Sequence, residues 1–424
     1  MTGSGRHSGL TAGKLTMVTK SEIIDIQSQM AEDLAPQTDR LVQQTIDLCN
    51  LNSDSFCPPS LEQTAAAVDG LFGAHFESVS HRQLPATPWL TDLGEFESVA
   101  PAKMLIYHTR PSAPLQFLLT GHYDTVHRHD GPFQNCKISG HQLHGPGTAD
   151  MKGGLVVMLE ACKAINNSPL ADQIGFTVAI SPDEEIGSLA SGPVLTSLAK
   201  DAHFGLTFEP ALADGTLAGA RKGSGNFALI LRGKSTHAGR KFFDGRNAVI
   251  AACDASTQLS QLSDEALGIT VNVSRIAGGS PENVVPDLAV VRFNARVFTT
   301  EQMNIEQRFQ GIAESVASQH QLDVTFQGSF SRPPKPMTPD LRAMFDVLCE
   351  CGQRLEIPIQ YNATGGCCEG NNLAAAGLTN IDTLGVCGAN IHSNQEYADI
   401  NSFVPRTQLT AFLISSLLAK QTLR

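Results

Sequence analysis

Short apolar runs alternate with longer amphipathic stretches through the first half of the chain. Four of the runs predict buried strands, at residues 104–109, 116–120, 175–180 and 203–208. We expect the first two of these strands to be neighbours in a sheet. Apolar positions at helical spacing predict helices at residues 22–50, 61–72 and 155–165. Because strands and helices alternate, the pattern favours an α/β fold with a mostly parallel sheet flanked by helices.

The order of elements changes near residue 220. The later pattern reads strand, helix, strand, strand, helix, strand, at residues 226–232, 245–262, 269–276, 289–298, 300–319 and 323–330. This is the order of a ferredoxin-like α+β unit. A Pro-rich segment at 331–339 then leads back to an α/β pattern, with a helix at 340–354, a strand at 380–386 and a final helix from Pro405.

The length of the chain favours more than one domain. We therefore predict an α/β domain made of residues 21–219 and 333–424, interrupted by an inserted domain at 220–332. Residues 1–20 are rich in Gly, Ser and Thr and lack the apolar core of a signal peptide, so we expect a disordered tail.

Charge and cysteine usage narrow the class of protein. The formal net charge of -12 argues against nucleic acid or an anionic membrane as a partner. No apolar run approaches the roughly 20 residues that a membrane span needs. The ten cysteines form neither a CxxC pair nor a regular framework, which indicates reduced thiols in a cytoplasmic protein.

Imidazole and carboxylate side chains follow several of the predicted strands. The motifs are GHYDTV with His122, GTADMKGG with Asp150, SPDEEIG with Glu184 and Glu185, FEPA with Glu209, and NIHSNQEY with His392. Ligands of open α/β sheets collect beyond the carboxyl ends of the strands. Taken singly, Asp150 could cap a helix, and the two adjacent glutamates could form a solvated charged pair.

Together these side chains predict a metal site. Zinc accepts imidazole and carboxylate ligands, and six such groups exceed what one ion needs. Two metal ions about 3.5–4 Å apart, sharing one carboxylate, would use the set.

The motifs, in this order from about residue 41 to 418, resemble those of the di-zinc metallopeptidases that include carboxypeptidase G, acetylornithine deacetylase, succinyl-diaminopimelate desuccinylase and aminoacylase. The FEPA and IHSNQEYADI segments are most similar to the carboxypeptidase-G branch. The resemblance implies a zinc-binding catalytic domain carrying an inserted lid or dimerisation domain. It also implies two Zn²⁺ ions as cofactors, which Co²⁺ or Mn²⁺ could replace.

The resemblance also assigns the metal ligands. His122 and Glu209 would bind one ion, and Glu185 and His392 the other. Asp150 would bridge both ions, and the peptide bond after it would be cis.

Two further acidic residues receive catalytic roles from the resemblance. Asp124 would orient the imidazole of His122, and Glu184 would act as general base. A metal-bound hydroxide would attack an amide carbonyl next to a free carboxylate. The expected activity is that of a carboxypeptidase, a dipeptidase or an N-acyl-amino-acid deacylase, with a peptide or N-acyl amino acid as substrate.

Family positions that bind substrate match five further residues: His237, Asn283, Arg296, Gly365 and Gly366. Arg296 suits the α-carboxylate, because a guanidinium meets a carboxylate in two parallel hydrogen bonds. The two glycines could offer backbone N–H groups to the same carboxylate. In relatives the residue matching His237 often acts from the partner subunit, so a homodimer formed through the inserted domain is expected.

The chain departs from the family in one loop. Cys367, Cys368 and Glu369 stand where relatives usually carry a small residue, then Ser or Thr, then Asp. This leaves the substrate class open, and with it the alternative of a weak or inactive carboxylate-binding protein of the same fold. A TIM-barrel amidohydrolase is disfavoured, because the chain lacks an eightfold strand and helix rhythm.

Overall fold

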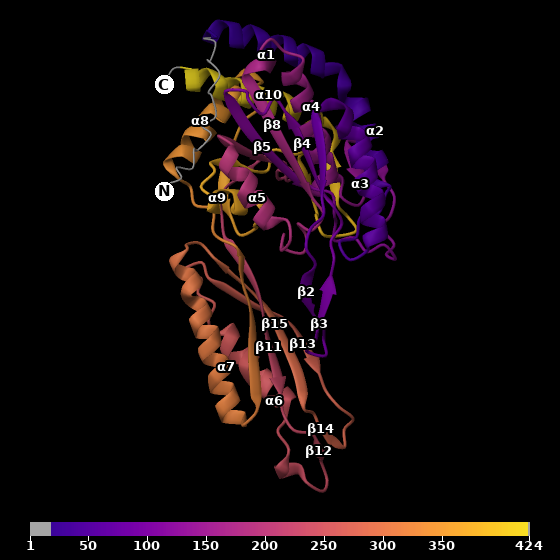
Figure 1. The fold of residues 1–424 in the computed structure, drawn as a ribbon, viewed down its shortest axis with the longest axis vertical. Helices are drawn as coiled ribbons and strands as arrows, with labels where there is room; N and C mark the ends of the chain where they lie inside the picture. Colours follow the sequence, from indigo (N-terminus) through magenta and orange to yellow (C-terminus); the bar gives the residue numbers. More distant parts are fainter. Residues whose placement is uncertain (1–17, 423–424) are drawn as a thin grey trace, which may run out of the picture.

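The computed structural model describes residues 18–422, which fold as two lobes (Figure 1). The larger lobe is built on a six-stranded sheet with the strand order β1-β4-β8-β5-β9-β18. In that order the strands are Ser78–Arg82, Met104–Thr109, Ile174–Ser181, Leu115–His122, Phe204–Thr207 and Asn380–Ile381.

The four strands from β8 to β18 pair in parallel, and β1 and β4 add antiparallel pairs at one edge. The sheet is therefore mixed, with the predicted parallel part at its centre. The prediction that the runs at 104–109 and 116–120 are neighbours was wrong, because β8 lies between β4 and β5.

Helices cover both faces of this sheet. In β5, Phe117 and Leu119 pack into the main core, whereas Leu118 belongs to a smaller core on the opposite face. This alternation follows from the two-residue repeat of a strand, so both faces of β5 need an apolar cover.

The helices of the larger lobe are α1 (Lys20–Leu34), α2 (Thr38–Cys49), α3 (Pro58–Phe72), α4 (Gly153–Asn166), α5 (Gly192–Leu198), α8 (Pro339–Arg354), α9 (Glu369–Ala375) and α10 (Phe403–Thr422). Within residues 18–422, no helix combines the length and the apolar character that crossing a membrane requires.

Most of the predicted tail, residues 1–17, lies outside the described residues. The last residues of the predicted tail are described. The Thr19 hydroxyl accepts a hydrogen bond from the backbone N–H of Glu22, and the Glu22 carboxylate accepts one from the backbone N–H of Thr19. This capping box starts α1 at Lys20, inside the predicted tail.

The smaller lobe has the predicted ferredoxin-like order. Its antiparallel sheet is ordered β13-β15-β11-β16, with strands Thr270–Gly278, Leu288–Val297, Gly223–Arg232 and Asp323–Arg332. Helices α6 (Ala248–Ser260) and α7 (Glu306–His320) cover one face of this sheet over a separate apolar core (Figure 1). The domain boundaries at 220 and 332 stay a prediction.

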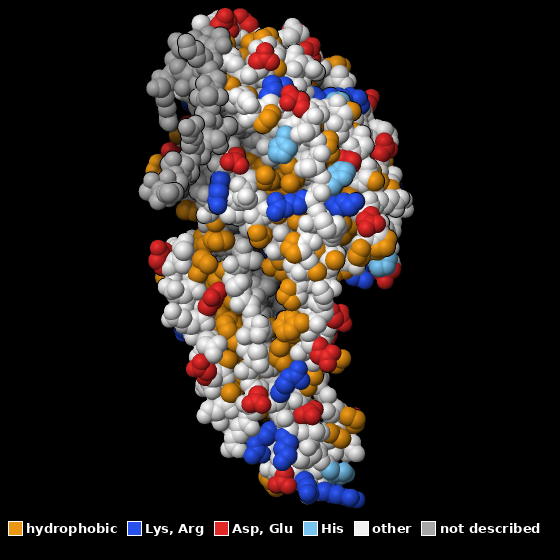
Figure 2. Space-filling model, viewed as in Figure 1, with side chains coloured by type: hydrophobic (Ala, Val, Ile, Leu, Met, Phe, Trp, Pro, Cys, Tyr) orange, Lys and Arg blue, Asp and Glu red, His pale blue; other side chains and the backbone are white. Residues whose placement is uncertain are grey.

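A hairpin of the larger lobe, formed by β2 (Thr87–Leu90) and β3 (Phe96–Val99), extends onto the inserted lobe (Figure 1). Leu90 packs with Ala228, Ile230 and Val290 on the face of the inserted sheet that α6 and α7 leave open. Hydrophobic side chains gather along this part of the surface (Figure 2). The sequence analysis missed this hairpin.

Short strands complete the fold. They are β6 (Lys137–Ser139), β7 (Gln142–His144), β10 (Leu217–Arg221), β12 (Thr236–His237), β14 (Val284–Val285), β17 (Tyr361–Thr364), β19 (Gly388–Ala389) and β20 (Tyr397–Asp399).

The chain crosses between the lobes twice, and the two crossing segments are hydrogen-bonded to each other. Arg221 and Lys335 exchange backbone hydrogen bonds of 2.9 and 3.0 Å, so the outgoing and returning segments pair. Both side chains also reach the buried carboxylate of Asp382, at 2.8 Å from Arg221 and 2.6 Å from Lys335. One buried ion cluster thus fixes the base of the inserted lobe to the larger lobe.

Candidate metal centre

The parallel register of the central strands brings three predicted ligand segments to one edge of the sheet. His122 at the end of β5 lies opposite Ser181 at the end of β8, and the Glu184-Glu185 turn follows three residues later. Glu209 follows β9, which pairs with the other side of β5. The carboxyl ends of parallel strands therefore deliver an imidazole and three carboxylates to one place.

Asp150 lies between the two predicted histidine ligands. Its Oδ1 is 3.2 Å from Nε2 of His122, and its Oδ2 is 3.2 Å from Nε2 of His392. Each oxygen of one carboxylate thus faces a different imidazole. The peptide bond between Asp150 and Met151 is cis, as the resemblance implies.

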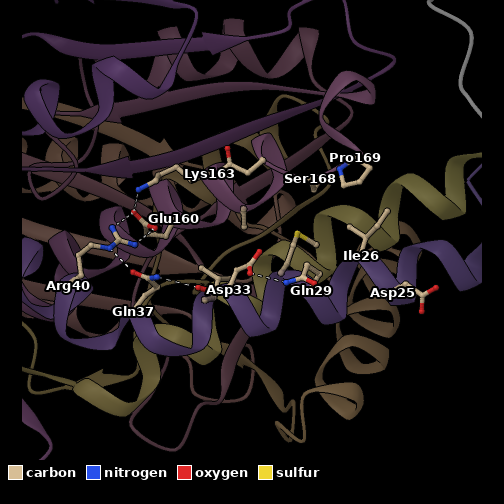
Figure 3. Close-up of a pocket in the computed structure, with 14 residues that line it drawn as sticks. Asp25, Ile26, Gln29, Asp33, Gln37, Arg40, Glu160, Lys163, Ser168 and Pro169 are labelled. Carbon is tan, nitrogen blue, oxygen red and sulfur yellow. Dashed lines mark hydrogen bonds and ion pairs between the residues drawn. The ribbon is translucent and has the colours of Figure 1, made fainter.

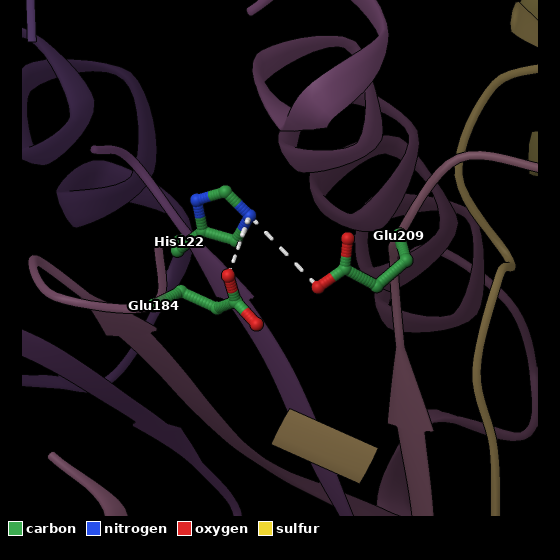
Figure 4. A group of neighbouring side chains, drawn as sticks. All are labelled: His122, Glu184 and Glu209. Carbon is green, nitrogen blue, oxygen red and sulfur yellow. Dashed lines mark ion pairs between the residues drawn. The ribbon is translucent and has the colours of Figure 1, made fainter. Parts of the chain in front are cut away.

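The three glutamates surround these histidines. Glu185 Oε2 lies 3.1 Å from Nε2 of His392, and Glu209 Oε1 lies 3.8 Å from Nε2 of His122. Glu184 Oε2 lies 4.0 Å from the same nitrogen, and Figure 4 shows both carboxylates pointing toward that imidazole. Glu209 Oε1 is buried and has no hydrogen-bond partner, which is costly unless a ligand satisfies it.

Burial and proximity shift the protonation of the group. Burial, and then the charge of Asp150, raises the pKa of Glu185 to about 8. The pKa of Glu209 is raised for the same two reasons. Hydrogen bonds to Asp150 and Glu185 raise the pKa of His392 to about 11. Glu185 and Glu209 therefore favour their protonated forms unless cations neutralise the cluster.

The residues present fit two divalent cations. Two clusters of donor side chains, His122 with Glu184 and Glu209, and His122 with Asp150 and Glu185, each place their possible ligand atoms within 4.8 Å of one another. The donors are imidazole nitrogens and carboxylate oxygens, which is the chemistry that Zn²⁺, Co²⁺ and Mn²⁺ accept.

Asp124 holds the glutamate turn as well as the histidine. Its carboxylate accepts backbone N–H bonds from Glu184 and Glu185 at 3.1 and 3.2 Å, and the hydroxyl of Ser55 donates to it at 2.8 Å. Nδ1 of His122 is 3.0 Å from the backbone oxygen of Asp124 and 3.4 Å from its carboxylate. Asp124 therefore positions three of the converging side chains.

Glu396 is a positioning residue that the sequence analysis missed. Its buried carboxylate accepts backbone N–H bonds from Gly147, Ala149 and Asp150 at 3.0–3.2 Å. His127, which has no assigned role in the sequence analysis, lies 2.7 Å from the same carboxylate. The only available signal was an unassigned acid inside the NIHSNQEY motif, four residues after His392.

Arg332 and the loop that contains Cys367 and Glu369 lie beside the Glu184-Glu185 turn. The Arg332 guanidinium lies 2.8 Å from Glu184 Oε1 and donates to the backbone oxygen of Glu184 at 2.7 Å. It also approaches the Cys367 thiol at 3.7 Å. Glu369 is fully buried, and burial raises its pKa to about 8. Nothing in the sequence distinguished Arg332 from other arginines of the inserted lobe.

The carboxylates face a cleft of about 670 Å³ between the lobes. Arg296 of β15 lines this cleft and donates to the backbone oxygen of Gly365 at 2.7 Å. Gly366 also lines the cleft, but its N–H points to the Thr364 hydroxyl at 3.3 Å. Of the predicted substrate residues, Arg296 and the glycine loop therefore meet at the cleft.

His237 and Asn283 lie elsewhere. Both are exposed: His237 ends β12 and Asn283 directly precedes β14, and these two strands lie at the far end of the inserted lobe (Figure 1). The backbone N–H of Ala238 donates to the oxygen of Asn283 at 2.9 Å, which holds the two segments together. The described chain does not bring either residue to its own metal centre.

A separate cavity of about 470 Å³ lies between α1 and the end of α4 (Figure 3). Its charged side chains largely pair with one another: Arg40 meets both oxygens of Glu160 at 2.8 and 2.6 Å, and Lys163 adds a contact of 2.8 Å. No predicted site residue lines this cavity.

Comparison with characterised sequences places these motifs in context. The chain is 29% identical over 313 residues to carboxypeptidase G2 from a Pseudomonas species, covering 71% of this chain and 73% of the relative. It is 28% identical over 308 residues to a succinyl-diaminopimelate desuccinylase from Colwellia psychrerythraea, covering 66% of this chain and 75% of the relative.

Solved structures share the fold. A dipeptidase from Saccharomyces cerevisiae superposes with a TM-score of 0.70 at 13% identity, over 94% of this chain and 99% of that chain. A dinuclear metal-binding peptidase from Bacillus subtilis gives a TM-score of 0.60 at 14% identity, over 91% and 99%. The model of peptidase family M20/M25/M40 matches residues 118–416. The chain therefore belongs to this peptidase family and is a hydrolase that acts on amide bonds.

Proposed function

We propose that the chain is a metal-dependent hydrolase that cleaves an amide bond adjacent to a free carboxylate, as a carboxypeptidase, a dipeptidase or an N-acyl-amino-acid deacylase. The observation that carries the proposal is the carboxylate of Asp150, which faces His122 with one oxygen and His392 with the other inside a cleft that also contains Arg296. The relatives named above include a carboxypeptidase, a desuccinylase and a dipeptidase, which all cleave amide bonds.

Two Zn²⁺ ions are the proposed cofactors, with Co²⁺ or Mn²⁺ as substitutes. His122 and Glu209 would hold one ion, Glu185 and His392 the other, and Asp150 would contact both. When bound, the ions lower the pKa of water and polarise a carbonyl oxygen.

Glu184 is the proposed general base. It extends from the same turn as Glu185, and its carboxylate borders the cleft. It would take a proton from the attacking water and pass it to the leaving nitrogen. The contact with Arg332 at 2.8 Å restrains its carboxylate, so the base would be held in place before substrate arrives.

Arg296 is the proposed partner of the substrate carboxylate. It extends from β15 into the cleft, and its contact with Gly365 fixes one edge of the guanidinium. The planar group would offer its remaining N–H donors to the carboxylate.

A second copy of the chain is proposed to supply His237. The residue is exposed and distant from the cleft of its own chain, whereas Phe243, six residues further on, leaves 91% of its surface uncovered. Phe242 is exposed as well, and its ring packs edge to face against that of Phe243, so the two form a contiguous aromatic patch that supports coverage by a partner. The inserted lobes would then form the homodimer contact.

Replacing Glu184 tests the assignment of the base. The full-length protein, loaded with zinc, is screened by mass spectrometry against dipeptides and N-acyl amino acids, and Glu184→Gln is measured on the best substrate. We expect turnover to fall at least about a hundredfold, because general-base catalysis contributes about 10²–10⁴-fold.

The bound metal is measured on the same samples. Two equivalents of metal in both the wild type and Glu184→Gln would support the role of Glu184 as a base. Loss of metal from Glu184→Gln would instead show that Glu184 is a ligand, an outcome to be tested because its carboxylate lies 4.0 Å from His122. Ligand binding without any product from the metal-loaded wild type would replace the proposal by that of a carboxylate-binding protein.

A further inference from the structure

Two aromatic side chains form part of the wall of the cleft. The rings of Phe56 and Trp89 meet edge to face, with centroids 4.8 Å apart and planes inclined at 68°. Both residues line the cleft that contains Asp150 and Glu184. Phe56 remains 40% exposed and Trp89 37%, so the pair leaves a large apolar surface open to the cleft.

Phe56 belongs to a turn that hydrogen bonds anchor beside the candidate metal centre. It follows Ser55, whose hydroxyl bonds the Asp124 carboxylate and whose backbone N–H donates to Thr125 at 3.2 Å. The backbone N–H of Phe56 itself donates to the Asp54 carboxylate at 3.0 Å. The ring is therefore carried by a turn that is hydrogen-bonded to the residues holding the glutamates.

Trp89 is attached to the inserted lobe. It lies on β2, next to Leu90, which packs on the inserted sheet. The hairpin is also held by Asp92, which pairs with Arg292 at 3.3 Å and with Arg275. Phe56 is thus anchored within the larger lobe, whereas Trp89 is anchored through its hairpin to the inserted lobe, and the two rings meet at the cleft.

The cleft continues beneath the hairpin. A second cavity of about 550 Å³ lies between the hairpin and the inserted sheet, and four residues line both spaces: Trp89, Ile186, Asn226 and Ser331. Phe96 and Leu189 add exposed apolar surface to its wall. Trp89 therefore lies where the cleft meets this extension, whose wall combines apolar side chains with the charged groups of Asp92 and Arg292.

The register of the inserted sheet orders these features. On β11, Ser224 pairs with Arg296, Asn226 lines both cavities, and Ala228 lines only the cavity beneath the hairpin. A substrate whose carboxylate meets Arg296 of β15 would thus have the extension beneath the hairpin further along the neighbouring strand β11.

From this arrangement we propose that Phe56, Trp89 and the β2–β3 hairpin form a subsite that selects substrates with a large apolar group, preferably an aromatic ring, at the end away from the carboxylate. The inference rests on the proposed amide hydrolysis and specifies its substrate class. Burial of a ring against two aromatic side chains is favourable, because it removes apolar area from water and adds edge-to-face contacts.

Fluorescence tests occupancy of the subsite without relying on turnover. Trp89 is the only tryptophan in the sequence, so its emission reports directly on this wall. The probes are N-phenylacetyl and N-acetyl derivatives of one amino acid, which differ only by the ring, added to the full-length, metal-loaded Glu184→Gln variant. We expect saturable quenching or a shift of the emission with the phenylacetyl probe at concentrations at least about tenfold lower than with the acetyl probe.

Kinetics test the selection itself. For the wild type, kcat/KM should be at least about tenfold higher for the phenylacetyl than for the acetyl substrate, and Trp89→Ala or Phe56→Ala should each remove most of that ratio. In both variants, kcat/KM should fall more for the phenylacetyl substrate than for the acetyl substrate. Leu93→Ala is the matched control, because Leu93 is exposed on the same hairpin and lines neither cavity.

The two failures are distinguishable. Equal emission responses to both probes, or a substrate ratio that Trp89→Ala leaves unchanged, would overturn the subsite. A selective emission response from a wild type that cleaves neither substrate would support the subsite and refute the proposed hydrolysis of these N-acyl amino acids.

Discussion

At the scale of single residues, the centre depends on carboxylates with different partners. Asp150 faces two imidazoles, whereas Asp124 and Glu396 are occupied mainly by backbone N–H groups of the segments that carry the ligands. A carboxylate that accepts several backbone hydrogen bonds fixes a loop without contacting a metal. Ligand geometry therefore depends on residues outside the ligand set.

Glu396→Gln should separate these two roles. The amide nitrogen would replace an oxygen that now accepts a backbone N–H, so the turn around Asp150 should loosen. We expect metal affinity to fall about 10–100-fold, as for other residues that orient ligands. Competition with a chromophoric chelator measures this, with the exposed neighbour Gln395→Ala as control. Equal affinities in Glu396→Gln and the wild type would contradict the role.

The sequence identified the side chains that converge in the candidate centre better than the residues that position them. His122, Asp150, Glu185, Glu209 and His392 stand in motifs whose residue types point to metal chemistry, and the fold brings them together. Ser55 and Arg332 act through hydrogen bonds between segments far apart in the chain. Such contacts leave no local pattern, so only the structure reveals them.

At the scale of elements, apolar runs predicted the buried strands, but not elements that depend on tertiary contact. The β2–β3 hairpin lacks a continuous apolar run and is held by Leu90 and Asp92 against the other lobe. The predicted strand at 380–386 forms only Asn380–Ile381. The chain turns there, with Asp382 in the buried ion cluster and Thr383 at a φ of 62°.

The cluster at Asp382 makes stability depend on pH. Burial opposes ionisation of Asp382, but Arg221 and Lys335 outweigh it and hold its pKa below the ordinary value. The unfolded chain therefore binds the proton first as pH falls, and the stabilisation, full above the ordinary Asp range near 3.9, is lost through the folded pKa.

Asp382→Asn should destabilise the protein by about 3–5 kcal/mol, because it leaves two buried cations without their carboxylate. Urea unfolding of the metal-free protein measures the loss. Between pH 5 and pH 3, the range in which an ordinary Asp titrates, the free energy of unfolding should also change less in the variant than in the wild type. Exposed Asp340→Asn, at the start of α8, is the control. A loss below about 1 kcal/mol would show that the cluster is not what joins the crossings.

At the scale of the whole molecule, one chain holds the metal centre and Arg296 in its own cleft but carries His237 at a distant tip. If the active unit is a dimer, each centre combines Glu184 of one copy with His237 of the other.

Mixing two inactive variants tests this combination. His237→Ala and Glu184→Gln should each lack activity, but co-refolded or co-expressed mixtures should regain part of it, since a mixed dimer contains one intact pair. Activity and native mass are measured on the same sample. A mixture as inactive as its components would refute action across the dimer, and partial activity of His237→Ala alone would limit the role of that residue.

Three of the attachments between the lobes have a mechanical consequence. The paired crossings at Arg221 and Lys335 define a single axis, about which the inserted lobe could swing if nothing else held it. The hairpin, clamped through Asp92, is a third anchor away from that axis, and it removes this rotational freedom. We therefore expect any widening of the cleft to require the hairpin to bend or to release the inserted sheet, although the hairpin contains none of the predicted metal ligands.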